Sequence, residues 1–224
     1  MGNKYFKCAK VSEGMFRRIV RCFADDQTAT ETSKSTGLSI RSVSPIFSRI
    51  RERISEFGDV AIHASSVQAS TFRFGPKGIR GPRGRGADRK TIVLVLYGEN
   101  DNVYMEVVPD ETKATLHPIM LSRLSMEIEI RTNGMQTFRN LVKIGFTNHI
   151  QTTGKITPFR DQSHRQGEPE IQQFWWNTER SLKKFLGMPM STRRMHLKER
   201  AFRQNFRNED LYLVILELLR KHPL

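Results

Sequence analysis

The chain has 224 residues, and its 37 lysines and arginines against 23 aspartates and glutamates give a formal net charge of +14. That length accommodates one medium-sized domain with a small one attached. No uncharged apolar run is long enough to cross a bilayer, and the start MGNKYFKCAK lacks the apolar core of a signal peptide, so we expect a cytoplasmic protein without membrane contact. The positive charge favours a polyanionic partner such as nucleic acid.

Residues 13–57 are predicted to form three helices separated by short turns. The apolar residues of the first helix recur at helical spacing and mark one buried face: Phe16, Ile19, Val20 and Phe23. Gly37 is expected to end the short second helix, because glycine accepts a positive φ angle, and Ser39 can cap the third. A short helix, a glycine-containing turn and a basic helix are typical of a helix-turn-helix domain, which we assign to residues 1–58.

The third helix is the predicted DNA-reading element. Opposite its apolar stripe it has a polar and basic face, and the residues expected to contact double-stranded DNA are Arg41, Ser42, Ser44, Pro45, Ser48, Arg49 and Arg51. Those near its N-terminus would reach base edges in the major groove, and the later arginines would meet phosphate. Pro45 removes one backbone hydrogen bond, so we expect the helix to begin near Ser42. A three-helix bundle with a solvated basic face is the alternative interpretation.

Residues 73–90, RFGPKGIRGPRGRGADRK, are the most biased segment of the chain. Glycine and proline prevent regular structure here, and basic side chains are spread throughout. We interpret the segment as a basic loop that follows a phosphate backbone, with Arg80, Arg83 and Arg85 as the contacts. A loop that is merely solvated is the alternative.

From Val67 onward strand and helix patterns alternate, and we assign residues 59–224 to a second domain. The predicted strands are residues 67–72, 91–97, 103–107, 127–132 and 146–150. The predicted helices are residues 111–123, 134–144, 170–186, 195–206 and 208–221. The expected fold class is therefore α/β, with a mixed five-stranded sheet flanked by helices and the first three strands as an antiparallel meander. This is also the element order of a ribonuclease-H-like domain.

Five segments of the second domain resemble, in order and spacing, the bacterial insertion-sequence transposases related to the eukaryotic Merlin elements, the ISXO-like group of DDE-type enzymes. The segments are GPRGRGADRKTIVLVLY, NVYMEVVPDETKATLHPIM, IRTNGMQTFRNLVKIGF, FWWNTERSLKKFLGMP and MHLKERAFRQNFRNEDLYLVILELL. Together with the turn GLSIRSV of the helix-turn-helix, the resemblance extends over residues 13–221. It implies a ribonuclease-H-like core that uses divalent metal to cut and join DNA ends.

Where that family carries its metal-binding carboxylates, this chain carries none. The family's first strand ends in an Asp-Glu-Thr-Tyr-like run, its fourth in Thr-Asp-Gly, and its late helix has a Glu shortly before Phe-Trp. The residues at those places, which we call the degenerate positions, are Ala69, Ser70, Asn133 and Gln172. Two-metal phosphoryl transfer needs carboxylates, because neutral oxygens cannot offset two divalent charges. We therefore expect no metal, no cofactor and no nuclease activity.

Several other residues are interpreted as structural. Trp175 and Trp176 are expected to pack in the core or between helices rather than to stack on bases, and the basic pairs at 183–184 and 193–194 are expected to be solvated. Glu179 stands where the family often has a lysine facing its site. The histidines and the two cysteines have no metal-ligand spacing.

The leading hypothesis is a catalytically inactive, transposase-derived DNA-binding protein of the nucleoid, acting in transcriptional regulation as a dimer. One alternative is an active or conditionally active strand-transfer enzyme with substitute carboxylates, for which Glu170, Asp88 and Asp110 are nearest in sequence. Glu170, however, lies two helical positions from Gln172 and should point elsewhere. Another alternative is a non-catalytic assembly protein whose former catalytic face binds a protein partner.

Overall fold

A computed structural model describes residues 3–6, 11–75, 90–139, 141–152, 156, 169–183 and 189–224. The chain divides into two compact units. One contains the described residues up to Asp59 together with Phe202–Leu224, and the other is Val60–Ala201. We expected all of residues 59–224 to form one domain. The structure instead groups residues 202–224 with the N-terminal helices, because the apolar face of the last helix completes their core.

The first unit begins with the three expected helices, α1 (Glu13–Ala24), α2 (Ala29–Thr36) and α3 (Ile40–Phe57). Each starts at a side-chain cap: Ser12 and Ser39 accept backbone N–H groups of α1 and α3, and Thr28 forms a capping box at α2. Gly37 ends α2 at a φ of +75°, as its sequence position predicted.

Helix α3 begins at Ile40 and continues through Pro45, so the expected start near Ser42 was wrong. The cap from Ser39 sets the first turn, and a proline near the start of the helix removes only one backbone hydrogen bond. Burial of the apolar stripe on both sides of the proline outweighs that loss; the stripe is Val43, Ile46, Phe47, Ile50 and Ile54.

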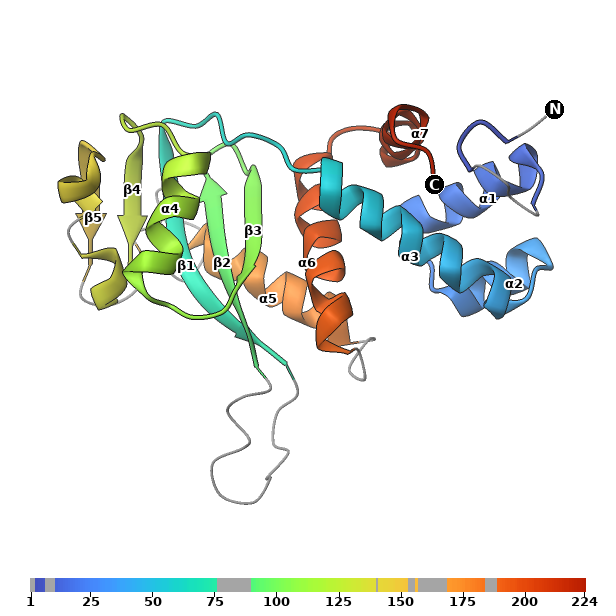
Figure 1. Ribbon diagram of the computed structural model, residues 1–224, viewed down its shortest axis with the longest axis horizontal. Helices are drawn as coiled ribbons and strands as arrows, with labels where there is room; N and C mark the ends of the chain where they lie inside the picture. Colours follow the sequence, from blue (N-terminus) through green and yellow to red (C-terminus); the bar gives the residue numbers. More distant parts are fainter. Residues whose placement is uncertain are drawn as a thin grey trace, which may run out of the picture. The chain divides into compact units, whose positions relative to one another are not determined.

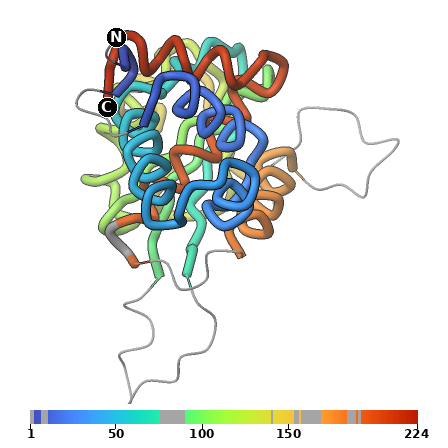
Figure 2. The backbone as a smooth tube through the Cα atoms, turned by 90° about the vertical axis from the view of Figure 1, so that its right-hand side faces the viewer, coloured from blue at the N-terminus to red at the C-terminus, as the bar shows by residue number. Residues whose placement is uncertain are grey.

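The last helix, α7 (Leu211–Lys221), packs against α1 and α3. Ile215 and Leu219 are fully buried in the same core as the aromatic residues of α1. In Figure 2 this red helix lies against the blue helix α1. The backbone N–H of Leu224 donates to the carbonyl oxygen of Tyr5 at 2.9 Å, which ties the two ends of the unit together.

The second unit contains the predicted mixed five-stranded sheet, and this expectation is confirmed. The strands are β1 (Ser66–Phe74), β2 (Thr91–Gly98), β3 (Val103–Val108), β4 (Glu129–Thr132) and β5 (Asn148–Gln151), in the spatial order β3-β2-β1-β4-β5. The first three pair antiparallel, and β4 and β5 continue the sheet in parallel with β1 (Figure 1). This arrangement is consistent with a ribonuclease-H-like domain.

Helices cover both faces of the sheet. Helix α4 (Lys113–Arg123) packs on one face, and α5 (Glu170–Leu182) with the first part of α6 (Met190–Asn205) packs on the other (Figure 1). The expected helix 134–144 was wrong: the described residues form two short 3-10 helices, η2 (Gln136–Phe138) and η3 (Leu141–Ile144). Burial of Phe138 and Leu141 in the core under α4 determines this backbone rather than local helix propensity. None of the described helices is long and apolar enough to cross a membrane.

A buried ionic cluster joins α6 to β3. Lys198 is only 2% exposed, and its Nζ lies 3.1 Å from one carboxylate oxygen of Glu106, while Arg194 reaches the other at 3.1 Å. The hydroxyl of Tyr104 also donates to Glu106, at 2.8 Å. Arg193 is buried, so the expectation that the pair at 193–194 is solvated was wrong for this residue, whereas Arg194 is exposed. Burial alone would raise the pKa of Glu106, but the cation of Lys198 and the hydroxyl of Tyr104 outweigh it and lower that pKa.

Replacing Glu106 by glutamine should reduce the free energy of unfolding at neutral pH by roughly 3 kcal/mol, because the buried Lys198 would lose the carboxylate charge that lies 3.1 Å from its Nζ. The lowered pKa means that ionised Glu106 stabilises the fold above the ordinary glutamate value of 4.5 and loses this effect as the pH falls through its folded pKa. In urea titrations, the difference in unfolding free energy between native protein and variant should therefore narrow as the pH falls below 4.5 and through the lower folded pKa of Glu106.

The exposed Glu127→Gln substitution is the matched control, and it should leave the unfolding free energy almost unchanged at every pH. If the difference in unfolding free energy between native protein and Glu106→Gln stayed constant as the pH was lowered, the ionised carboxylate would not be the stabilising group.

Candidate functional site

One face of α3 is exposed and holds most of the residues predicted to contact DNA. We call it the α3 surface; its exposed members are Arg41, Ser42, Pro45, Ser48 and Arg49. The opposite face carries the apolar stripe that packs in the core of the first unit. The helix therefore presents a basic and hydroxyl-rich strip, with the exposed apolar residues Ile40 and Phe57 at its two ends.

Two residues of the predicted set are less accessible than the others. Ser44 is half-buried. Arg51 is also half-buried, and its guanidinium lies 5.2 Å from the centre of the Phe23 ring and 5.7 Å from that of Phe47. Arg49 is exposed but packs over Phe6 at 5.0 Å. These cation–π contacts restrict the long side chains and so fix where their charges lie on the surface.

The predicted basic loop is described only at its ends. Arg80, Arg83 and Arg85 lie outside the described residues. Arg73, at the end of β1, pairs with Glu111 at 3.0 Å. This arginine is thus engaged with a carboxylate of its own unit.

Successive side chains of β1 point to opposite faces of the sheet. Ala69 belongs to the core under α4, whereas Phe72 stacks on Trp175 of α5 with ring centroids 4.6 Å apart. Gln68 and Ser70 share the face of Phe72, because residues two apart in a strand point the same way. Of the two degenerate positions in β1, Ser70 therefore faces α5, and Ala69 faces away into an apolar core.

Gln68 connects β1 directly to the first turn of α5. Its side chain is fully buried, its Nε2 donates to a carboxylate oxygen of Glu170 at 2.7 Å, and its Oε1 accepts the backbone N–H of Ile171 at 2.8 Å. Pro169, the N-cap residue of α5, provides no side-chain cap. Gln68 thus supplies from a neighbouring strand the acceptor that an N-cap side chain ordinarily provides. Sequence reasoning missed this role, and a lone glutamine within a buried strand was its only local signal.

On the opposite face of β1, Glu111 connects the strand to the start of α4. Its carboxylate accepts a hydrogen bond from the hydroxyl of Thr71 at 2.7 Å and pairs with Arg73. The Thr71 hydroxyl also lies 3.5 Å from the sulfur of Met135, which follows β4. Glu111 was not among the candidate carboxylates, and its approach to β1 depends on the fold of a segment far away in sequence.

Asn133 and Gln172 lie in segments that adjoin β1. Ala69 is paired in register with Thr132, the last residue of β4, so that Asn133 follows directly beside β1. Gln172 is half-buried and belongs to the turn of α5 that Gln68 holds. Ser70, Asn133 and Gln172 therefore belong to neighbouring segments, namely the middle of β1, the end of β4 and the first turn of α5, whereas Ala69 lies on the other face of the sheet.

The carboxylates considered as substitutes have other partners. Glu170 is held in the contact with β1. Asp110 accepts hydrogen bonds from Thr115 and Thr112, which lower the pKa of its carboxyl group and brace the start of α4. Asp88 lies outside the described residues. Within the described ranges, no group of three or more His, Cys, Asp and Glu side chains is placed to hold a metal ion.

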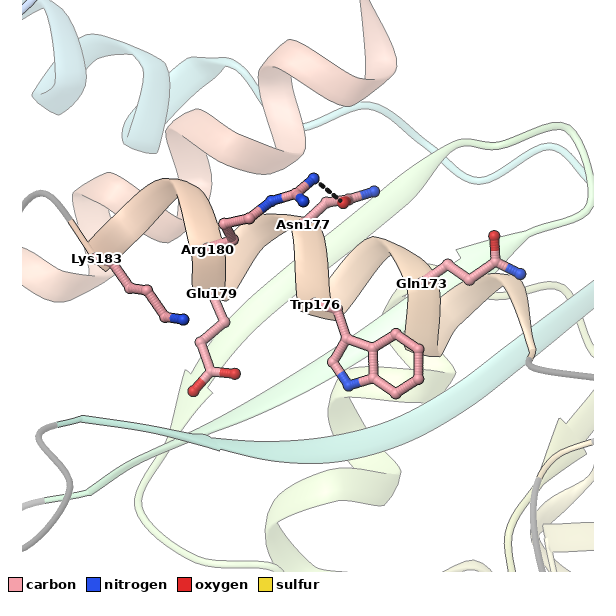
Figure 3. Close-up of a pocket in the computed structure, with 6 residues that line it drawn as sticks. All are labelled: Gln173, Trp176, Asn177, Glu179, Arg180 and Lys183. Carbon is pink, nitrogen blue, oxygen red and sulfur yellow. Dashed lines mark hydrogen bonds between the residues drawn. The ribbon is translucent and has the colours of Figure 1, made fainter. Parts of the chain in front are cut away.

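The outer face of α5 forms a surface pocket of about 490 Å³, which we call the α5 surface. Its lining residues are Gln173, Trp176, Asn177, Glu179, Arg180 and Lys183 (Figure 3). Trp175 is buried, as expected of a core residue, but Trp176 is 50% exposed, so the expectation that both tryptophans pack internally was wrong for the second. Adjacent helical residues point about 100° apart, and α5 uses its buried face for Trp175.

The comparisons with known proteins identify one family. Residues 70–205 match the family model described as the ISXO2-like transposase domain. No curated protein matches the chain.

Gln68→Leu should destabilise the second unit, because it removes both hydrogen bonds to α5 and leaves the buried N–H of Ile171 without this acceptor. We expect the free energy of unfolding to fall by about 2 to 4 kcal/mol, the cost of leaving buried polar groups unsatisfied. Urea denaturation followed by circular dichroism would measure it. Gln136→Leu, at an exposed site, is the matched control and should change little. Equal effects of the two substitutions would refute the role of Gln68.

Proposed function

The chain belongs to the family of ISXO2-like transposase domains, and from this premise we propose that it is a sequence-specific DNA-binding protein of transposase origin that no longer cuts DNA. Its role would be transcriptional regulation, with a dimer bound to a repeated or palindromic site on the nucleoid. The observation that supports the proposal is the side-chain chemistry of the degenerate positions, none of which is a carboxylate. The carboxylates described beside β1, Glu111 and Glu170, are paired with other side chains.

The donor groups at the degenerate positions do not fit a pair of divalent metal ions. Ala69 offers no ligand atom and points away from α5, Ser70 offers a neutral hydroxyl, and Asn133 and Gln172 offer neutral amides. Mg²⁺ binds through carboxylates and phosphate oxygens, and two such ions side by side need several negative charges to offset their own. No catalytic step through metal is therefore assigned to this chain.

The α3 surface supports the DNA-binding half of the proposal. Arg41, Ser42 and Pro45 lie in its first two turns, which is the part of a recognition helix that reaches base edges. Arg49 lies further along, where a guanidinium can meet phosphate, and its contact with Phe6 holds it in place. The net charge of +14 adds attraction to DNA that does not depend on sequence.

The double substitution Arg41→Ala, Arg49→Ala should weaken binding to a selected target duplex by roughly a hundredfold, since each good contact contributes about 1–3 kcal/mol. Target sites would first be found by genome-wide mapping, and affinity would then be measured by fluorescence anisotropy at fixed salt. Arg220→Ala, Lys221→Ala removes two exposed positive charges of the same unit and is the matched control. If the control weakened specific binding as much, or if the native protein preferred no duplex over random DNA, the proposal would fail.

By contrast, substitution of Arg80, Arg83 and Arg85 should lower affinity for all duplexes by a similar factor. Phosphate contacts carry no base information, so the ratio of specific to random binding should hardly change. The dependence of the logarithm of affinity on the logarithm of salt concentration should become shallower, by about one for each lost contact.

An active strand-transfer enzyme is the second candidate. It is supported by two carboxylates that flank β1 on its two faces, Glu111 and Glu170. We expect no cleavage or joining of bound DNA in Mg²⁺ or Mn²⁺ by the native chain. We also expect no change in its melting temperature when either ion is added, since both carboxylates are already paired. Metal-dependent cleavage that disappears in Glu170→Ala or Glu111→Ala would establish the enzyme and overturn the proposed function.

A further inference from the structure

Trp176 is a large aromatic side chain that does not belong to the buried core of the second unit. Its neighbour Trp175 lies 4% exposed and stacks on Phe72, at an interplanar angle of 11°. Trp176 points about 100° away around α5 and leaves half of its surface in water. A half-exposed indole contributes less packing energy to the fold than a buried one, and exposed aromatic residues are enriched where a protein binds a partner.

The charged side chains around Trp176 extend from different sides of α5. Figure 3 shows the indole of Trp176 and the side chains of Glu179 and Lys183 extending to one side of α5, with Asn177 and Arg180 on another. Arg180 is fixed there, because its guanidinium donates to the Asn177 side-chain oxygen at 2.9 Å. The pocket therefore combines a flat aromatic face, one carboxylate and two cations within about 10 Å of helix.

We propose that the α5 surface binds an unpaired base of single-stranded DNA. The base stacks on the indole of Trp176, the carboxylate of Glu179 accepts a hydrogen bond from an exocyclic amino group, and Lys183 and Arg180 contact the adjoining phosphates. The proposal rests on the proposed function in one respect, namely that DNA is the partner, and it adds a second site with a different form of DNA as ligand.

An unpaired base fits the chemistry of the α5 surface better than a duplex does. In a duplex the flat face of each base is covered by its neighbours, so an indole can stack only on a base that has left the helix. Stacking on an aromatic side chain together with backbone contacts to cations is the usual mode of single-strand binding. Glu179 adds selectivity, since a carboxylate pairs with the amino group of cytosine and repels the carbonyl oxygen that thymine has in its place.

The test uses the full chain with labelled oligo-dC and oligo-dT and with the target duplex, at one salt concentration. The native protein should bind oligo-dC more tightly than oligo-dT, and its tryptophan fluorescence should be quenched on binding. Trp176→Ala should weaken oligo-dC binding by roughly ten- to a hundredfold, the range for loss of one stacked base. Trp176→Phe should retain most of the affinity, and Val142→Ala, another exposed apolar residue of the same unit, should retain all of it.

Glu179→Gln is the specific test of base selection. The amide keeps the size of the side chain and can turn either an oxygen or an NH₂ group toward the base, so the preference for oligo-dC over oligo-dT should largely disappear. Overall affinity for single strands should not fall, because a negative charge beside the phosphates has been removed.

Comparison with the α3 surface separates this proposal from the proposed function. The double substitution Arg41→Ala, Arg49→Ala should weaken binding of the target duplex and leave the affinity for oligo-dC unchanged. The substitution Trp176→Ala should weaken binding of oligo-dC and leave the affinity for the duplex unchanged. Single-strand affinity within twofold of native in Trp176→Ala overturns the α5 proposal alone. A Trp176→Ala variant that changes the oligomeric state without changing single-strand affinity would also overturn it, and would identify a protein interface instead.

Discussion

The hydrogen bonds of Gln68 place α5 on β1, and most of what the second unit presents on that face depends on them. The amide is fully buried, so its two polar ends must find partners within the protein. It finds them in the first turn of α5, where Pro169 leaves the helix without a side-chain cap of its own. This contact fixes the start of α5 on β1, and the packing of α5 in the core then determines where Trp175 and Trp176 point.

The two carboxylates next to β1 have a structural role in the described fold. Glu170 accepts from Gln68 on the face of α5, and Glu111 accepts from Thr71 and pairs with Arg73 on the face of α4. Hydrogen bonds and an arginine offset these negative charges within the protein. These side-chain contacts hold α5 and the start of α4 against the central strand.

Some of the positively charged side chains make contacts within the fold, and others are exposed on the surface. Lys198 and Arg194 neutralise Glu106 beneath α6, and Arg51 lies against aromatic rings of the first unit. The exposed cations on α3 and α5 lie in two different units. Their neighbours also differ: hydroxyl groups accompany them on α3, and an indole and a carboxylate on α5. This difference is the basis for assigning the two surfaces to different forms of DNA.

The sequence by itself determined the features that depend on local chemistry. Ser39 and Gly37 mark helix boundaries through caps and backbone freedom, and the apolar run 92–97 forms a buried strand wherever it lies in a sheet. The same reasoning identified the family, because its segments recur in order.

Only the tertiary structure decided which side chains meet across long stretches of chain. Residues 134–144 follow the core that Phe138 and Leu141 must enter rather than their own helical pattern. Residues 202–224 complete a core begun by α1, and Gln68 acts as a cap for a helix more than a hundred positions away. Trp175 and Trp176 are identical in local preference, and the packing of α5 alone buries one and exposes the other. Local energies fix turns and caps, but burial and long-range hydrogen bonds arise only when the whole chain is folded.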